Sequence, residues 1–180
     1  RIMNRVRSDE GLAYSASSHF PGGVYYPSIF MAGFQSKSRT VAYASSIVIE
    51  EMERIRNEDV TDEEMQVSKA SFIDTFPRNF GAKSQVADTF SEDEFTGRYA
   101  KDKNYWKDYR DRVQAVTKAE IKRVAKKYLD PEKIVLLVVG KKDDLLKGHP
   151  DHPERLESLA GGKVTEVPLR DPFTMKPMKE

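Results

Sequence analysis

The sequence predicts an α+β fold in which helices gather on one face of a mostly antiparallel sheet. Two aromatic-rich runs flank a Pro-Gly-Gly turn at residues 21–23, the middle of the chain has a helical period, and an apolar, largely β-branched run occupies residues 134–139. Three predicted strands make a small sheet for the number of helices predicted to pack on it. We therefore expect further strands before Arg1 and interpret the chain as the later part of a longer polypeptide.

The composition is that of an ordered globular chain without charge bias. Of 180 residues, 38% are hydrophobic, and 30 Lys and Arg face 29 Asp and Glu, so there is no electrostatic case for a nucleic-acid partner. Cysteine is absent, which excludes thiolate catalysis but fits both a cytoplasmic and an exported protein. The longest apolar run is far shorter than the ~20 residues that cross a bilayer, so no membrane span is predicted.

A helix end and a hairpin are predicted at the start of the chain. Apolar residues at positions 2, 3 and 6 have helical spacing, and Gly11 stands where a helix stops. Residues 12–20 then alternate in polarity like a half-buried strand, with Tyr14 on the apolar side. Residues 24–34 form the second run, so an antiparallel hairpin is the economical pairing.

Helices are predicted from residue 41 onward. Apolar residues at positions 41, 44, 48, 52 and 55 form one stripe of a helix that packs on the sheet. Thr61, followed by three acids, caps a second helix that Pro77 breaks, and Phe72 is expected on the buried side of that helix. Residues 82–99 and 105–116 are also expected to be helical. Thr117 caps a last helix, which Pro131 stops.

The final part of the sequence predicts one central strand and a polar tail. The uninterrupted apolar run at residues 134–139 ends at Gly140 and is typical of a strand covered on both faces. From Lys141 onward the chain is polar and punctuated by prolines. One further edge strand is expected at residues 164–168.

Three histidines are the candidates for metal ligation, and none is convincing. His149 and His152 form a His-x-x-His pair, which binds zinc when a helix brings both imidazoles to one face, but Pro150 and Pro153 oppose a helix here. His19 stands alone. The zinc-peptidase patterns His-Glu-x-x-His and His-x-x-Glu-His do not occur, so we predict no metal site in this chain.

Arg7 and Tyr14 are the candidate site residues. A cation at the end of a helix and a phenol in the following strand can point at the same space, because Gly11 lets the chain reverse between them. The charged guanidinium and the neutral phenol donor together suit a peptide carbonyl or a developing oxyanion. The alternative is structural: a helix-terminal Arg favours the helix dipole, and a strand Tyr on an apolar face usually lies in the core.

The segment Arg-x-x-x-Gly-Leu-Ala-Tyr-Ser at residues 7–15 resembles the second-half signature of the pitrilysin or insulinase family of zinc metallopeptidases, the inverzincins. The Val-Thr helix starts at residues 60–64 and 116–121, and the segments at 124–133 and 138–140, follow in the same order. The resemblance implies a substrate-binding half-domain over residues 1–143 that lacks its first strands, with an extension over residues 144–180.

The resemblance also implies a peptidase of two related αβ halves that close around an unfolded peptide. One half bears zinc and the general base, and the other supplies an Arg/Tyr pair. Matched residue by residue, Arg7 anchors a substrate carbonyl, and Tyr14 binds the scissile region and stabilises the oxyanion. This chain lacks the zinc helix, so it is not a complete peptidase alone. Zinc is expected on another domain or on a partner subunit.

An extended peptide is the substrate that the resemblance implies, added to an exposed strand edge within residues 12–34. Four aromatic residues there are candidates for the chamber wall or for the core: Tyr25, Tyr26, Phe30 and Phe34. Two other functions stay open. One is a non-catalytic assembly subunit of the same fold, like the structural homologues in respiratory complexes, and the other is an α+β binding module whose motif arose by chance.

Overall fold

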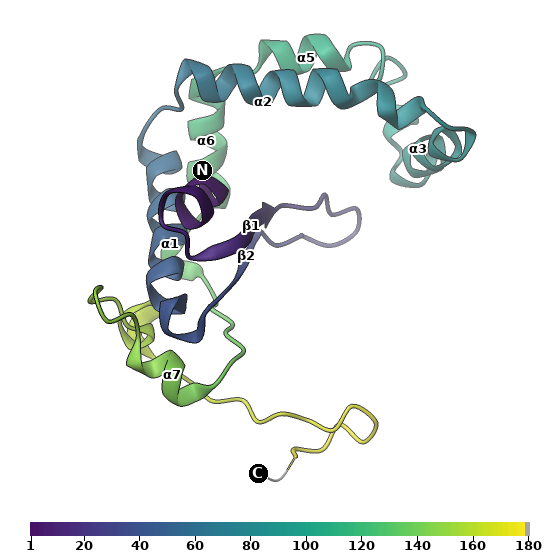
Figure 1. Cartoon of the computed structure of the whole chain (residues 1–180). Coiled ribbons are helices and arrows are strands. Elements are labelled where there is room, and N and C mark those ends of the chain that lie inside the picture. Colours follow the sequence, from purple (N-terminus) through teal and green to yellow (C-terminus); the bar gives the residue numbers. More distant parts are fainter. Residues whose placement is uncertain (179–180) are drawn as a thin grey trace. The chain divides into compact units, whose positions relative to one another are not determined.

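The computed structural model describes residues 1–178 of the chain, which form two compact units. The first unit comprises Arg1–Ser17, Gly33–Glu50 and Pro131–Glu180, and the second comprises Ser18–Ala32 and Glu51–Asp130. Figure 1 follows the chain through its helices and a two-stranded antiparallel sheet. The predicted α+β class is confirmed.

The chain begins with a wide helical turn that leads into a hairpin. A short α-helical start at residues 2–3 continues as the π-helix η1 (Asn4–Asp9), and β1 (Ala13–His19) then pairs with β2 (Met31–Ser36). The predicted hairpin is confirmed, but its second strand begins at Met31 rather than at Val24. Pro27, which has no N–H to donate to a ladder, lies in the intervening loop.

Every helix predicted between residues 41 and 128 is present. Two of them begin with reciprocal capping boxes, in which Thr61 pairs with Glu64 and Thr117 pairs with Glu120. The helices are α1 (Val41–Asn57), α2 (Asp62–Thr75), α3 (Lys83–Thr96), α4 (Arg98–Lys101), α5 (Tyr109–Ala115), α6 (Lys118–Tyr128) and α7 (Lys142–Lys147). Short 3₁₀ turns are η2 (Ser38–Thr40), η3 (Phe76–Phe80), η4 (Pro131–Lys133), η5 (Leu156–Ser158) and η6 (Ala160–Gly162).

The first unit has a small apolar core around the start of α1. Ala42 on α1, Leu145 on α7 and Leu156 on η5 are buried together. The Nε of Arg39 donates a hydrogen bond to the carbonyl oxygen of Gly148 at 3.2 Å, which ties the segment after α7 to η2. The partly buried residues Val41, Leu136, Val138 and Leu159 pack against this core.

Two predicted strands are absent from the described residues. Residues 134–139 alternate between packed and exposed side chains, as a strand does, but they form no ladder. A strand assignment needs a paired neighbour, and the strands of the described chain, β1 and β2, pair with each other. Residues 164–168 are irregular and exposed, and one isolated bridge joins Arg170 to Pro177 beyond them. The edge-strand prediction there is wrong.

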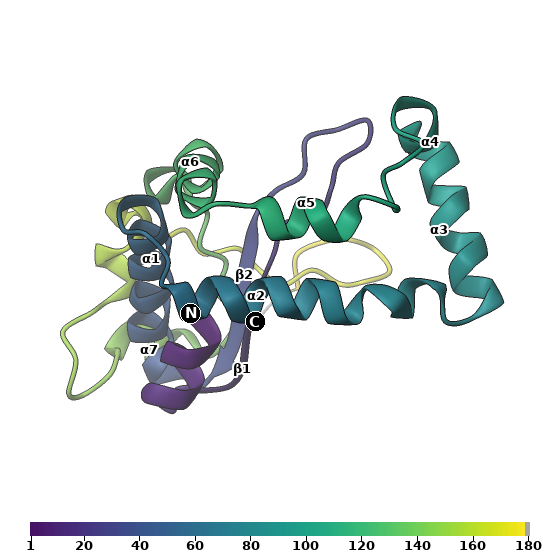
Figure 2. The ribbon, with the colours of Figure 1, turned by 90° about the horizontal axis from the view of Figure 1, so that it is seen from above.

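In the second unit α5 lies beside α2 (Figure 2). The Nζ of Lys69 on α2 donates to the carbonyl oxygen of Gln114 on α5 at 2.7 Å. Phe76 stacks on Tyr109 with ring centroids 4.7 Å apart, whereas Phe72, expected in the core, is 59% exposed. None of the helices described within residues 1–178 is long and apolar enough to cross a membrane.

Candidate functional site

The structure brings Arg7 and Tyr14 together in the first unit. Gly11 has φ +61°, in the left-handed region that favours glycine, and its N–H donates to the carbonyl oxygen of Arg7 at 3.1 Å. The chain reverses there, as the sequence predicts. The guanidinium carbon of Arg7 lies 5.3 Å from the ring centroid of Tyr14, which is a cation–π contact.

Neither side chain of this pair belongs to the core. Arg7 is exposed and Tyr14 is 85% exposed, so the sequence-based alternative of a core Tyr is wrong. Ala16 is the buried residue of β1. The face that Tyr14 shares with Ala16 is therefore covered at Ala16 and open at Tyr14, and the phenol is available to a ligand.

The π-helix that carries Arg7 is anchored to α1 on one side of the arginine. Val6 is fully buried, which anchors the helix at the residue next to Arg7. Beside it, Nη1 of Arg5 lies 2.9 Å from Oε2 of Glu50 on α1 in an ion pair. These contacts hold the backbone of the site arginine while its own side chain stays in solvent.

A second contact with α1 lies just after Arg7 in the chain. The phenol of Tyr43 on α1 lies close to the carboxylate of Glu10, at the end of η1. Burial raises the pKa of Tyr43 above its ordinary value, and the neighbouring Glu10 raises it further. Sequence reasoning missed this pair, because a Tyr between two alanines on a helix gives no signal of its partner.

A shallow depression opens beside Tyr14. It has a volume of about 560 Å³ and is lined by residues 11–14 and 35–37, from the reversal, β1 and the end of β2. Lys37 adds a positive charge to its wall, and Gln35 and Ser36 add polar groups. The arrangement offers cations and neutral donors, which suit carbonyl and carboxylate oxygens.

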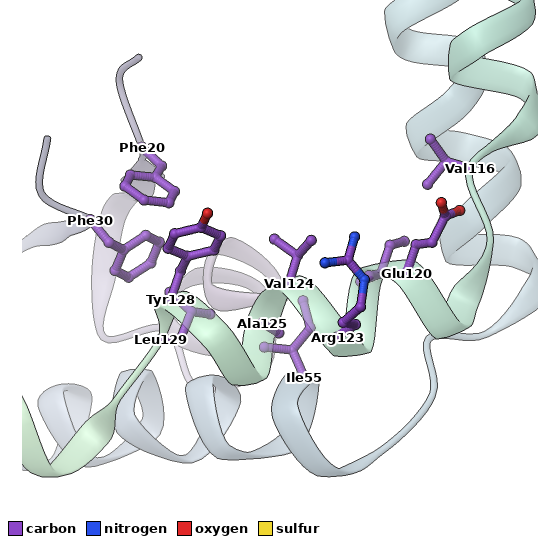
Figure 3. A pocket seen from close by; sticks show the side chains of 11 residues that line it. Phe20, Phe30, Ile55, Val116, Glu120, Arg123, Val124, Ala125, Tyr128 and Leu129 are labelled. Atoms are coloured by element: carbon purple, nitrogen blue, oxygen red, sulfur yellow. The ribbon is translucent and has the colours of Figure 1, made fainter. Parts of the chain in front are cut away.

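A second depression, in the second unit, is apolar (Figure 3). Its volume is about 510 Å³. The ring of Phe20 meets that of Tyr128 edge to face, with centroids 5.8 Å apart. Phe30, one of the aromatic residues expected in the chamber wall or core, lines this pocket. Of the other aromatic residues expected in the chamber wall or core, Tyr25 and Tyr26 are exposed and Phe34 is half-buried.

The apolar pocket around Phe20 and Tyr128 can hold an apolar side chain. It is completed by Ile55, Val116, Glu120, Ile121, Arg123, Val124, Ala125 and Leu129.

The histidines do not form a zinc site. The rings of His149 and His152 lie 4.7 Å apart, and Tyr43 stacks on His152 at 3.6 Å. The Nδ1 of His149 accepts a hydrogen bond from the N–H of Asp151 at 3.1 Å, so this nitrogen is already engaged. Within residues 1–178 no group of three or more His, Cys, Asp or Glu side chains is placed to hold a metal ion. These residues do not fit zinc.

The segment that carries Arg7 and Tyr14 lies within the part of the chain that matches a known family. Residues 1–72 match the peptidase M16 inactive domain. The resemblance to the second-half domain of pitrilysin-type (M16) peptidases is confirmed. The matched residues include Arg7, Gly11 and Tyr14, together with β1, β2, α1 and most of α2.

Two solved structures share the fold of this chain. One is the crystal structure of a peptidase M16 inactive domain from Pseudomonas fluorescens, with 20% identity over 72% of this chain and a TM-score of 0.59. The other is a protease from Helicobacter pylori, with 22% identity over 71% of this chain and a TM-score of 0.55. The chain spans about 30% of the length of each. No curated protein matches the sequence.

Proposed function

We propose that this chain is the substrate-binding half of a zinc-dependent endopeptidase, with the zinc site on another domain or subunit. The observation that carries the proposal is the pairing of Arg7 with Tyr14 at 5.3 Å, both exposed, with Tyr14 in the wall of an open depression. The match of residues 1–72 to a peptidase domain supports it. The substrate is an extended peptide.

Each member of the pair has its own role in this proposal. Arg7 donates hydrogen bonds from a group that stays charged at every working pH, so it anchors a backbone carbonyl of the substrate. The hydroxyl of Tyr14 has no hydrogen-bond partner among residues 1–178. It donates to the scissile carbonyl and stabilises the tetrahedral oxyanion of peptide hydrolysis.

The hairpin offers the substrate a backbone to pair with. In the described chain β1 and β2 pair with each other alone, so each keeps one open edge. An extended peptide that adds to such an edge gains affinity from backbone hydrogen bonds, which tolerate many sequences. Tyr14 lies in β1 and therefore beside any peptide bound along that strand.

Peptide hydrolysis by the assembly with a zinc-bearing M16-type partner tests this proposal. We expect Arg7→Ala and Tyr14→Phe each to lower turnover ~10²-fold or more, the scale on which an oxyanion donor acts. Arg78→Ala and Tyr99→Phe, at exposed positions outside the site, are the matched controls and should leave turnover unchanged. Full turnover by Tyr14→Phe would remove the catalytic assignment.

The second candidate is a non-catalytic assembly subunit of the same fold. The description of the matched family as an inactive domain favours it. For such a subunit, Arg7→Ala and Tyr14→Phe should leave both peptide binding and assembly unchanged. Titration of the unaltered chain with an unstructured peptide, followed by calorimetry, separates the two, since only the substrate-binding half is expected to bind it.

A further inference from the structure

Lys37 carries a positive charge that is left without a partner at the candidate site. It follows directly after β2 and lines the depression beside Tyr14. Its ammonium group has neither an ion pair nor a hydrogen bond within residues 1–178, because the bonds that Lys37 makes there end on its backbone carbonyl. The charge is therefore available to a ligand.

The backbone of Lys37 is fixed, although its side chain is free. The carbonyl oxygen accepts hydrogen bonds from the N–H of Thr40 at 2.9 Å and from the hydroxyl of Thr40 at 2.8 Å. The hydroxyl of Ser36 donates to the same oxygen at 3.3 Å. The backbone at Lys37 is extended, so its side chain lies on the same side of the chain as that of Gln35. The ammonium group thus starts from a fixed point on the wall of the depression.

The charges around the depression are of one sign. Among the described residues that line it, Lys37 is charged and none is Asp or Glu. Arg7, which lies against the ring of Tyr14, adds a second cation that has no ion pair within the described chain. Asp9 and Glu10 precede the depression in the sequence but do not line it. A ligand at this wall therefore meets positive charge, which favours an anion.

The proposed function gives no role to Lys37. In that proposal Arg7 anchors a backbone carbonyl and Tyr14 donates to the scissile carbonyl, so the side chains of the neighbouring substrate residues lie over the depression. A carboxylate is the side-chain group that a free ammonium attracts. Because a lysine head is a compact charge on a flexible stem, it selects a charge rather than one geometry, and both Asp and Glu satisfy it.

We infer that Lys37 determines specificity and that the site takes extended peptides with an acidic side chain next to the bond held at Tyr14. The inference rests on the proposed function, since it concerns the same site. The free carboxyl end of a peptide offers Lys37 the same chemistry, and the experiment separates these two sources of a carboxylate.

Calorimetric titration of the full chain with capped peptides tests the inference. The probe is acetyl-Ser-Thr-Val-Glu-Val-Thr-Ser-amide, in which the glutamate side chain is the sole carboxylate. Two further peptides carry Gln or Lys in place of Glu, and a fourth is the Gln peptide with a free carboxyl end. The variants are Lys37→Glu, which reverses the charge, and Lys37→Gln, which removes it. Lys163→Glu, at an exposed residue of the C-terminal tail, is the matched control.

The wild type is expected to bind the Glu peptide ~3-fold or more tighter than the Gln peptide at low salt, the scale of an exposed ion pair. This preference should shrink at ~1 M salt, where screening is strong. Lys37→Gln should bind the two peptides equally, and Lys37→Glu should prefer the Lys peptide. Lys163→Glu should keep the wild-type order. Far-UV circular dichroism of each variant checks that the fold is kept.

Two results would overturn the inference and leave the proposed function intact. One is a wild-type order of affinities in both Lys37 variants. The other is tighter binding of the Gln peptide with a free carboxyl end than of the Glu peptide, because the chain end would then be the recognised group. Failure of all four peptides to bind the wild type is a different result, which removes the proposed function and this inference together.

Discussion

Nη1 of Arg5 lies 2.9 Å from Oε2 of Glu50 on α1, two residues before Arg7 in the chain. Tyr43, also on α1, lies close to Glu10, just beyond Arg7. These contacts with α1 hold the segment that presents the arginine, although the two candidate site residues are themselves exposed.

Alkaline pH should weaken the contact between Tyr43 and Glu10. Burial, and then Glu10, raise the pKa of Tyr43 above its ordinary value of 10.0. A group whose pKa is raised in the folded state contributes stability that is fully present below about pH 10, its unfolded value, and is lost as pH rises through the folded value. We expect the Tm of the wild type to fall more steeply above pH 10 than that of Tyr43→Phe. Parallel Tm curves for the two proteins would show that the contact with Glu10 contributes nothing to stability.

Substitution of Gly11 should cost stability through the backbone alone. A Cβ at Gly11 meets no atom within 4 Å, but φ is +61°. Gly11→Ala should therefore lose about 1 kcal/mol in urea unfolding, and Gly11→Asn less, because Asn tolerates the left-handed region. Gly33→Ala is the control, since a Cβ there also meets nothing and its φ is not positive. Equal losses at the two glycines would contradict this account of the reversal.

The buried carboxylate of Asp93 should make the second unit sensitive to Arg98. Asp93 is 2% exposed, accepts a hydrogen bond from Nε1 of Trp106, and lies 3.0 Å from Nη1 of Arg98. Arg98→Ala leaves a buried charge without its cation. We expect a loss of about 2 kcal/mol, below the full cost for a wholly buried pair because Arg98 is partly exposed.

The fluorescence of Trp106, the one tryptophan of the chain, reports unfolding of this region directly. Lys107→Ala, at an exposed neighbour, serves as the control and should unfold at the same denaturant concentration as the wild type. An unchanged midpoint for Arg98→Ala would mean that the indole alone satisfies Asp93.

Acid should release the capping box of α6. Hydrogen bonds from the backbone N–H and then the hydroxyl of Thr117 lower the pKa of Glu120 below its ordinary value of 4.5. A lowered pKa contributes stability above the unfolded value, and that contribution is lost as pH falls through the folded value. The Tm of Glu120→Gln should therefore lie below that of the wild type at pH 7 and approach it below pH 4. A constant difference across this range would exclude ionisation of Glu120 as the cause.

Local patterns predicted the helices well, because each depends on residues close in sequence. Thr61 and Thr117 begin helices through side chains three residues away, and Pro77 and Pro131 mark ends that need no distant partner. The reversal at Gly11 belongs to the same class. Phe72 was misplaced because its burial depends on whether another element covers that face, which helical periodicity does not state.

What the sequence by itself determined is the α+β class, the order of the helices, the hairpin, and the segment from Arg7 to Tyr14 that resembles an M16 peptidase. The tertiary structure alone decided that the Arg7 guanidinium lies against the Tyr14 ring, that Arg5 pairs with Glu50, and that residues 134–139 have no paired neighbour among residues 1–178. The physical reason is the separation along the chain over which each kind of interaction acts. Caps, turns and periodicity are interactions of neighbours along the chain, whereas pairing and burial depend on residues that only folding brings close.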